Sequence, residues 1–571
     1  MWTRMKGFGG MAGIVALSVM AMFASRAQAD TSTRWLSAPT DSAWENAANW
    51  DNGVPYGTAV LFNNLVTNGV AWLTNTVSSY TVNYTVPTNA FNKLTLQNAG
   101  SFITTLNINT NGFATLCLNE ASPGPLGQLI VNANSVVNVN SNGVADVGSS
   151  ITLATSTGSG GILNVNRGGA VTWGEQCSNQ GILLNGGTLN VYGSIRGALG
   201  TWAGNQSVTI NNGTGTSTVN IDGGIAFWDG TSVANRGTGV LNITNNATMT
   251  IRNNGLSVGI GNNTPYVAKV NMSSGTVSNR SNLVIAKAPS ASTSTGTGTL
   301  NLSGGSFVQF GVTTVGEARN GTLNISGSGL FVTTNMVFVG GTTAPALSAS
   351  ATASGNINLA GGQFFATNSF GAATLNVGNA VTGTVTLAGG SLTVDRLVVT
   401  NGGFSILTFN SGTLTAKATT ISNGVALTVG NGSATAVLGL LTGTHSFADG
   451  LVVNTNAVFA VGGTNALGAA AIAGNVTLRP GAVLDCDFNA STNDWAQIAG
   501  TLTLPASATL SLRTLDGALR GTIPVVQATA ISGDAGAWSP VLVNGWKYRA
   551  AVSGNQLRLE RVMKGTALSV Y

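Results

Sequence analysis

The chain has 571 residues, of which 43% are hydrophobic and only 7% are charged. Ordinary soluble domains carry about 25% charged residues, but a chain this apolar buries enough surface to fold, so intrinsic disorder is excluded. Its 23 basic and 18 acidic side chains give a net charge of +5 without a basic cluster, which argues against nucleic acid as a partner. The composition predicts a folded protein, rich in Gly, with an uncharged polar surface.

Residues 1–29 have the layout of a secretory signal peptide. Arg4 and Lys6 precede an apolar stretch at 11–24, and Ala27-Gln-Ala29 is a small-x-small cleavage sequence. The apolar stretch is too short to span a bilayer comfortably, and no later stretch reaches the ~18 apolar residues of a transmembrane helix. The sequence therefore predicts an exported protein, extracellular or on the outer cell surface, with no transmembrane segment in the mature chain.

Residues 30–90 are unusually rich in tryptophan. Because the end coil of a stacked fold exposes apolar surface unless something covers it, this segment is predicted to be an N-terminal cap. The alternative is that its aromatic rings form a platform for stacking sugars. The tryptophans concerned are Trp35, Trp44, Trp50 and Trp72.

A Gly-x-Leu-Asn-apolar motif recurs through residues 91–444, the predicted solenoid repeats. In its full form, Gly321-Thr-Leu-Asn-Ile-Ser-Gly327, Leu323 and Ile325 face one side of a strand and Asn324 faces the other. A Gly-Gly pair often follows and permits positive φ, and a later strand of each repeat ends in Val-Gly. The first apolar position returns at steps of 22 to 34 residues, at Val219, Leu241, Val270, Leu300, Leu323, Ile357, Val385 and Leu407.

Three short strands per repeat, with glycine at the corners, predict an all-β fold: a right-handed parallel β-helix, or β-solenoid. A set of β-sandwich domains also has short strands, but it does not explain one motif returning at one-coil intervals. The motif fades after residue 444. Alternating stretches such as Leu502-Thr-Leu504 and Gln556-Leu-Arg-Leu559 predict C-terminal coils and a β cap over residues 445–571, so the solenoid is expected to carry capping segments at both ends.

Two motifs suggest chemistry without supporting it. Gly255-Leu-Ser257-Val-Gly259 matches the G-x-S-x-G pattern of serine hydrolases, which requires a strand–turn–helix context and a histidine. Ser257 instead aligns with the strands that end in Val-Gly. The sole histidine of the chain, His445, is predicted to be a turn or surface residue, and one histidine cannot build a histidine metal cluster.

The densest acidic patch of the sequence is Asp485, Asp487 and Asp494. Asp485 and Asp487 are two residues apart and would share one face of a strand. Paired carboxylates can serve as acid and base in polysaccharide cleavage, or bind Ca²⁺. The segment offers little partner chemistry beyond Arg479, so solvated carboxylates are the favoured interpretation. No catalytic, cofactor-binding or metal-binding residue is assigned.

Two segments resemble a known family. The run Trp44-Glu-Asn-Ala-Ala-Asn-Trp-Asp-Asn-Gly-Val-Pro55, after Trp35, resembles the start of autotransporter-associated β-strand repeat proteins, which are exported by Gram-negative bacteria. The Gly-Thr-Leu-Asn-Ile-Ser-Gly repeats resemble their passenger coils, and 493–504 resembles the end of such passengers. Residues 495–571 are too few for a translocator barrel with its linker. The resemblance implies a stand-alone passenger without that barrel.

The sequence thus predicts a secreted or cell-surface β-solenoid with a structural or adhesive role, without catalysis and without a cofactor. Its expected partners are extracellular carbohydrate, matrix or other surface proteins. The alternative is a carbohydrate-active β-helix enzyme, either a polysaccharide lyase or a glycoside hydrolase. The same scaffold serves both functions, so the arrangement of ionisable side chains must distinguish them.

Overall fold

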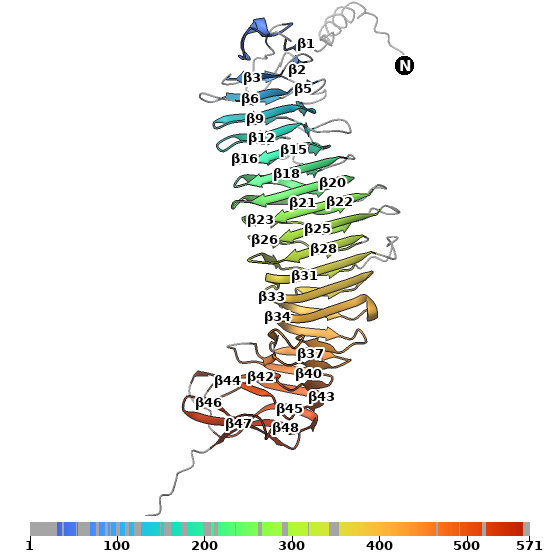
Figure 1. Ribbon diagram of the computed structural model, residues 1–571, viewed down its shortest axis with the longest axis vertical. Coiled ribbons are helices and arrows are strands. Elements are labelled where there is room, and N and C mark those ends of the chain that lie inside the picture. Colours follow the sequence, from blue (N-terminus) through green and yellow to red (C-terminus); the bar gives the residue numbers. More distant parts are fainter. Residues whose placement is uncertain are drawn as a thin grey trace, which may run out of the picture.

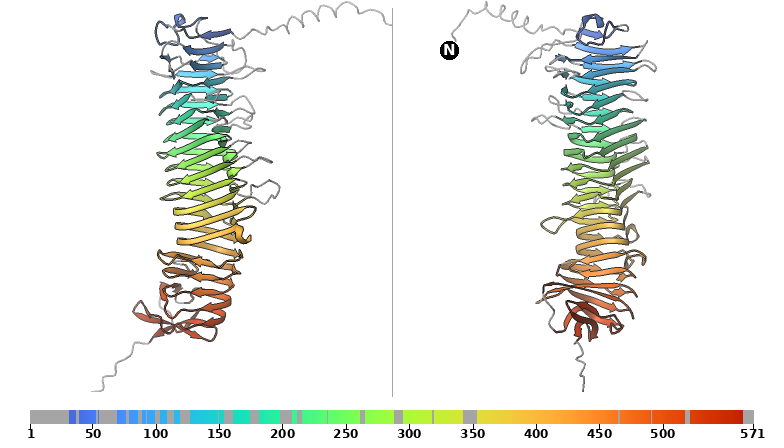
Figure 2. Two further views of the ribbon diagram at one scale, coloured as in Figure 1. Left: turned by 45° about the vertical axis from the view of Figure 1, so that its right-hand side comes forward. Right: turned by 60° about the vertical axis from the view of Figure 1, so that its left-hand side comes forward.

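The computed structural model shows an elongated stack of β coils, a parallel β-solenoid (Figures 1 and 2). Within the part of the chain that the structure describes, no helix is long and apolar enough to cross a membrane. The predicted signal peptide lies outside the described residues. These are residues 31–562 apart from 37–38, 53, 55–68, 76–78, 86–88, 92, 99–102, 109–113, 119–126, 149, 154–160, 174–180, 198–206, 211–214, 235, 261–264, 288–294, 318, 342–352, 464–465, 490 and 517–520.

Each coil contributes one strand to each of three parallel sheets, here called sheets 1, 2 and 3 in the order in which a coil visits them. The strands confined to sheet 1 are β3 (Tyr80–Tyr84), β6 (Thr104–Ile108), β9 (Ser135–Val139), β12 (Ile162–Val165), β15 (Thr188–Val191), β18 (Thr216–Asp222), β20 (Gly237–Thr244), β22 (Tyr266–Met272), β25 (Gly296–Leu302), β28 (Asn320–Ile325), β35 (Leu427–Val429), β38 (Leu451–Val453) and β41 (Val476–Leu478).

Sheet 2 follows a sharp corner after sheet 1. Its own strands are β4 (Asn89–Phe91), β7 (Ala114–Leu118), β10 (Gly143–Val147), β13 (Ala170–Trp173), β16 (Ser194–Gly197), β23 (Thr276–Asn279), β26 (Ser306–Gln309), β29 (Leu330–Thr333), β36 (Ala436–Leu440), β39 (Ala457–Val461), β42 (Val483–Asn489) and β44 (Thr509–Asp516).

Sheet 3 closes each coil. Its own strands are β1 (Thr31–Arg34), β2 (Gly69–Asn75), β5 (Lys93–Asn98), β8 (Gln128–Val131), β11 (Ser150–Leu153), β14 (Ile182–Leu184), β17 (Ser207–Ile210), β24 (Leu283–Lys287), β27 (Thr313–Val315), β30 (Val337–Val339), β32 (Thr374–Val377), β37 (Gly443–Phe447) and β40 (Ala469–Ala473).

Some strands turn a corner and run through more than one sheet. β33 and β34 pair with each other in all three sheets in turn, with register shifts at the first corner. The others join two sheets. These long strands are β19 (Ile225–Val233), β21 (Thr248–Ile260), β31 (Ser354–Ala366), β33 (Thr382–Val399), β34 (Ser405–Ile421), β43 (Trp495–Thr503) and β45 (Ile523–Ser532).

The predicted repeat is the unit of stacking. The eight apolar positions that the sequence places one repeat apart lie opposite one another in sheet 1, from Val219 and Leu241 to Val385 and Leu407. Leu323 and Ile325 are buried and Asn324 faces outward, as predicted. Alternation therefore puts one row of every strand into a continuous apolar interior.

Two glycine positions explain why the motif needs that residue. Gly340, which directly follows β30, has φ +87°, a conformation that L side chains rarely adopt. Gly383 opens the next copy of the motif, and a Cβ there would lie 2.1 Å from the carbonyl oxygen of Val339. At the corner between sheets 3 and 1 the backbones of neighbouring coils are thus in direct contact, and a side chain at Gly383 would prevent that contact.

Both ends of the stack are covered. At the N-terminal end, Trp35, Trp44 and Trp50 are buried beside a 3-10 turn, η1 (Ala47–Asn49). Their rings pack edge to face, with centroids of Trp44 and Trp50 4.7 Å apart. Burial favours the capping role for these three rings over a sugar platform. The boundaries at residues 90 and 445 remain predictions.

The C-terminal end changes direction. β45 pairs antiparallel with β48 (Gln556–Val562), and β47 (Trp546–Ser553) pairs antiparallel with β48 and with β46 (Val541–Val543). These strands cross the end of the rod (Figure 1) and bury Tyr548 against Phe488 at 5.8 Å. The other 3-10 turn, η2 (Gly402–Phe404), lies at a corner between β33 and β34.

Candidate functional site

A ladder of asparagine side chains runs along the outer face of sheet 1. In each step the Nδ2 of one asparagine donates to the Oδ1 of the asparagine one coil nearer the N-terminus, at 2.7 to 3.0 Å. The rungs from Asn107 onward lie within the predicted repeats 91–444, and Asn83 adds one rung from the segment predicted as the N-terminal cap. The rungs are Asn83, Asn107, Asn138, Asn164, Asn190, Asn220, Asn242, Asn271, Asn301, Asn324 and Asn358.

The ladder has a direction and two ends. Asn83 begins it by donating to Oγ of Ser42 at 3.0 Å. After Asn358 the same row continues as Thr386 and Thr408. Aligned amides polarise one another, so each bond strengthens the next. The outer face of sheet 1 is thus a fixed, uncharged, hydrogen-bonded surface that offers no titratable group along these rungs.

Buried aspartates pair with cations of the next coil at several corners. Asp229 contacts Nε of Arg252 at 2.8 Å, and Asp395 contacts Nζ of Lys417 at 2.7 Å. Both aspartates are fully buried. Burying an unpaired carboxylate costs several kcal/mol of desolvation free energy, on the order that a buried ion pair must offset. Each pair therefore holds one coil against the next, and neither aspartate is a free acid. The signal in the sequence was a basic residue about one repeat after an aspartate.

The acidic patch predicted from the sequence is brought together, but it is not solvated. Asp485, Asp487 and Asp494 are 3%, 0% and 1% exposed, so the interpretation as solvated carboxylates is wrong. Asp485 and Asp487 do share a face of β42, and Arg513 of β44 lies over them. Its guanidinium pairs with Asp485 and, through Nε, with Oδ1 of Asp487 at 3.2 Å. Sequence reasoning missed Arg513, which follows Leu510-Ser-Leu512 in register with β42.

Asp494 is satisfied by backbone instead of by a cation. Its Oδ1 accepts from the N–H of Gly468 at 2.8 Å and its Oδ2 from that of Asp487 at 2.7 Å. Burial raises the pKa of Asp494 to about 7, against the effect of these two hydrogen bonds. Among the described residues no group of three or more His, Cys, Asp or Glu side chains could hold a metal ion. Arg513 and backbone N–H groups contact both oxygens of Asp487 and Asp494 and Oδ2 of Asp485.

His445 is also buried, and its prediction as a turn or surface residue is wrong. It lies in β37 opposite Thr419, with its Nε2 3.0 Å from the carbonyl oxygen of Leu441 and its Nδ1 3.4 Å from Oγ1 of Thr419. A carbonyl only accepts, so Nε2 carries the proton of the neutral ring. Burial lowers the pKa of His445, which keeps the ring uncharged.

Ser257 is a strand residue, as predicted. It lies in β21, opposite Val284 of β24, and no helix follows it. Seven strand-to-strand steps along sheet 3 separate β21 from β37, which is about 34 Å at ~4.8 Å per step. Ser257 and His445 therefore cannot form a nucleophile and base pair.

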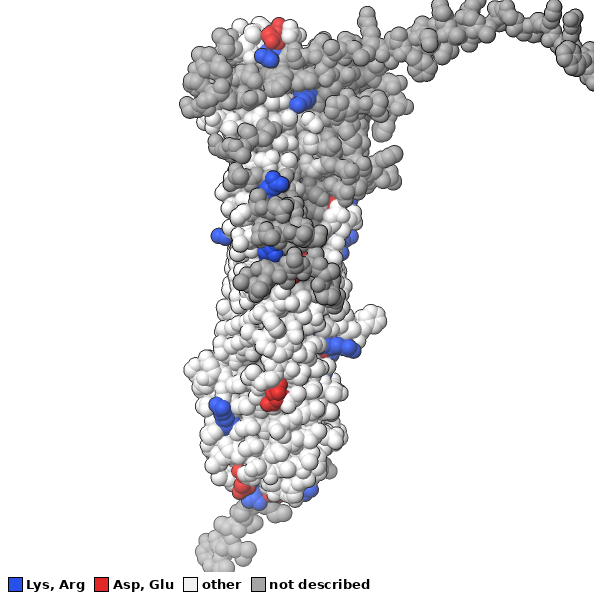
Figure 3. Space-filling model, turned by 90° about the vertical axis from the view of Figure 1, so that its right-hand side faces the viewer, with Lys and Arg blue, Asp and Glu red and all other residues white. Residues whose placement is uncertain are grey.

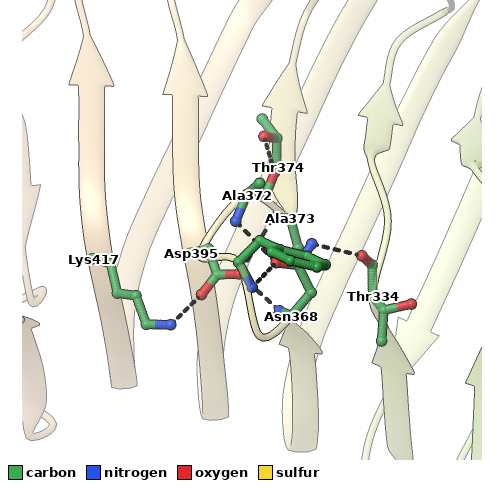
Figure 4. A network of polar contacts seen from close by, with 8 residues as sticks. Thr334, Asn368, Ala372, Ala373, Thr374, Asp395 and Lys417 are labelled. Atoms are coloured by element: carbon green, nitrogen blue, oxygen red, sulfur yellow. Dashed lines mark hydrogen bonds and ion pairs between the residues drawn. The ribbon is translucent and has the colours of Figure 1, made fainter.

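A network around Asp395 shapes the surface at one corner (Figure 4). Oδ2 of Asp395 accepts from the backbone N–H groups of Asn368 at 2.8 Å and Ala373 at 3.3 Å. Its Oδ1 pairs with Lys417, whose side chain is 45% exposed. The carboxylate thus holds both ends of the loop at 367–373 and one half-exposed cation.

The same loop is braced from within. Oδ1 of Asn368 accepts from the N–H groups of Phe370 at 2.9 Å and Ala372 at 3.1 Å. Its Nδ2 donates to the carbonyl of Thr334, one coil away, at 3.0 Å. Beside the loop lies an open groove of about 450 Å³ over the outer face of sheet 3, whose lining includes Gly371, Arg396, Lys417, Thr420, Thr444 and Ser446.

Charged side chains are sparse on the face of the rod that Figure 3 shows. In the space-filling view, Lys, Arg, Asp and Glu side chains lie singly or in small groups, and the described surface between them is uncharged (Figure 3). A dense field of one sign, which would steer nucleic acid to this face, is not visible.

No protein-family model matches the chain, and no curated protein matches its sequence. Among solved structures, the Hap adhesin of Haemophilus influenzae aligns with a TM-score of 0.20 and 12% sequence identity. The alignment covers 87% of this chain but 64% of that chain, so the chain spans less than two thirds of the adhesin's length.

Proposed function

We propose that the protein is a secreted or cell-surface β-solenoid with a structural or adhesive role, similar to an autotransporter passenger and acting without catalysis. The observation that carries this proposal is the asparagine ladder, which runs from Asn83 to Asn358. It makes a long face of the rod rigid and chemically uniform. Such a face suits contact with a matrix or with other surface molecules, because its amides both donate and accept hydrogen bonds.

The arrangement of ionisable groups supports the same proposal. The carboxylates that the sequence offers as acids or bases are buried, and each is held by Arg513 or by backbone N–H groups. The sole histidine is buried and uncharged. General acid–base catalysis requires such groups within reach of a substrate.

Fractionation of the native producer tests the location. An antibody to the mature chain should detect the protein in outer-membrane or surface-matrix material, with a periplasmic protein as the marker for leakage. Retention in the periplasm or cytoplasm would contradict the proposal.

The absence of catalysis is tested separately. Purified protein is incubated with a panel of neutral and acidic polysaccharides, and new reducing ends and unsaturated products are measured. We expect none above a heat-denatured control. Release of either product would favour the polysaccharide lyase or glycoside hydrolase alternative.

A further inference from the structure

Loop 367–373, whose Gly371 lines the groove, carries an exposed aromatic ring on a braced backbone segment. Phe370 is 89% exposed, more than any other large hydrophobic side chain in the described part of the chain. The loop that carries it is held by Asp395 from below and by Asn368 from within. A side chain on a braced segment loses less conformational freedom on binding, and an aromatic ring supplies a large contact area with only two side-chain torsions.

The groove adds polar chemistry to that ring. Arg396 is exposed and Lys417 is half exposed, while the carboxylate of Asp395 is buried beneath Lys417. An ammonium has three donors, and Lys417 uses one toward Asp395 at 2.7 Å, so the others can face a ligand. With two cations against one buried carboxylate, the groove carries a net positive charge.

Hydroxyl groups line the floor in register. Thr420 lies opposite Ser446 on neighbouring strands of sheet 3, and Thr444 is exposed on the same strand as Ser446. Neighbouring strands are about 4.8 Å apart, so these donors and acceptors repeat along the rod axis. An elongated ligand with hydroxyls on successive units matches such a row.

We propose that this groove binds an acidic oligosaccharide, a proposal that rests on the adhesive function above and names its ligand class. The Phe370 ring packs against the apolar face of one sugar. Arg396 and Lys417 pair with carboxylate groups of the chain, and Thr420, Thr444 and Ser446 exchange hydrogen bonds with its hydroxyls. Charge complementarity favours a uronate over a neutral glycan.

Calorimetry on the full mature chain tests the assignment. The probes are a short polygalacturonate oligosaccharide and the same oligosaccharide with its carboxyl groups reduced to alcohols. We expect the acidic form to bind more tightly, and its affinity to fall with salt because exposed ion pairs are screened.

Point variants localise the binding. Phe370→Ala should weaken binding of both probes about tenfold, the size of a typical anchor contact. Arg396→Gln should weaken the acidic probe and leave the reduced probe unchanged. The matched controls are Phe404→Ala and Arg479→Gln, which alter an exposed ring and an exposed cation outside this groove and should bind both probes like the wild type.

The outcomes separate this site from the broader function. Equal affinity for the two probes overturns the assignment of an acidic ligand. If Phe404→Ala loses binding and Phe370→Ala does not, the ligand binds elsewhere and the assignment of the binding site to this groove is wrong. If neither probe binds while the protein is found on the cell surface, the groove assignment fails and the structural or adhesive role stands. If the protein is confined to the periplasm and still binds the acidic probe, the surface role fails and the groove assignment stands.

Discussion

The amide of Asn324 donates from Nδ2 to Oδ1 of Asn301 across 2.8 Å, and Asn301 repeats this bond toward Asn271. Each of these side chains therefore donates and accepts at once, in one direction along the rod. Removal of one rung leaves an unpaired donor on one side and an unpaired acceptor on the other. The cost of a lost rung is thus larger than that of one isolated surface hydrogen bond.

Asn301→Ala should lower the free energy of unfolding by about 1–3 kcal/mol, because two partly buried hydrogen bonds are lost. Thr299→Ala is the matched control: Thr299 lies on the same outer face of β25, and its change should stay within about 0.5 kcal/mol. Urea denaturation followed by circular dichroism measures both. Equal effects of the two substitutions would show that the ladder adds nothing to stability.

Arg513→Met should destabilise the fold by about 2–4 kcal/mol, since it leaves Asp485 and Asp487 buried without their cation. The comparison is Arg549→Met, which breaks the pair with Glu560, where the side chains are 56% and 31% exposed. That exposed pair should contribute less than about 1 kcal/mol. Thermal unfolding of both variants measures the difference, and a reversed order would contradict the structural role given to Arg513.

His445 should make the protein less stable in mild acid. Burial lowers its pKa from the ordinary 6.5, so the unfolded chain takes up a proton before the folded one does. The stability contribution of the neutral ring is complete above pH 6.5 and is lost as pH falls through the lowered folded pKa. Urea midpoints at pH 7.5 and 5.5 should therefore differ less in His445→Gln than in the wild type. An unchanged difference would refute this assignment.

Asp494 should affect the pH dependence of stability in the direction opposite to His445. Burial raises its pKa from 3.8 to about 7, so the folded protein holds this proton more tightly than the unfolded chain. The contribution is complete below about pH 4 and is lost as pH rises to 7. Asp494→Asn cannot titrate, so it should flatten that part of the profile. Urea midpoints measured in a series from pH 4 to pH 8 check this effect, and a steeper decline of stability in the variant would disprove it.

Two phenylalanines of the same chain should behave differently. Phe331 is stacked between Phe307 and Phe364, with ring centroids 5.5 and 5.1 Å away, so Phe331→Ala should cost about 3–5 kcal/mol through the cavity it leaves. Phe370→Ala removes an exposed ring and should change stability by less than about 0.5 kcal/mol. Thermal unfolding checks both values. A large loss for Phe370→Ala would also invalidate it as a binding probe.

The repeat could be located from the sequence because one short pattern serves sheet 1 in coil after coil. Leu323 and its equivalents in neighbouring copies lie opposite one another, and their alternation with Asn324 gives the two faces. Glycines at the corners were predicted for their positive φ. The close approach that also requires glycine at Gly383 depends on the neighbouring coil, which no local pattern specifies.

The environments of the ionisable residues could not be predicted in the same way. Alternation correctly placed Asp485 and Asp487 on one face, but Arg513 covers that face from the next coil. His445 lies where the motif has faded, so the strand β37, which turns it inward on the same face as Phe447, was not predicted. Local sequence specifies which side of a strand a residue occupies; what covers that side depends on the register between coils.

The antiparallel pairing among β45 to β48 also has a consequence for end-to-end stacking of separate chains. A parallel stack bonds along its own axis, so a bare last coil would template another chain in the way that fibrils grow. Because β48 runs against β45 and the buried Tyr548 covers Phe488, this end offers no matching coil to an incoming copy. The cap thus removes the edge that would let a second copy continue the parallel stack at this end of the rod.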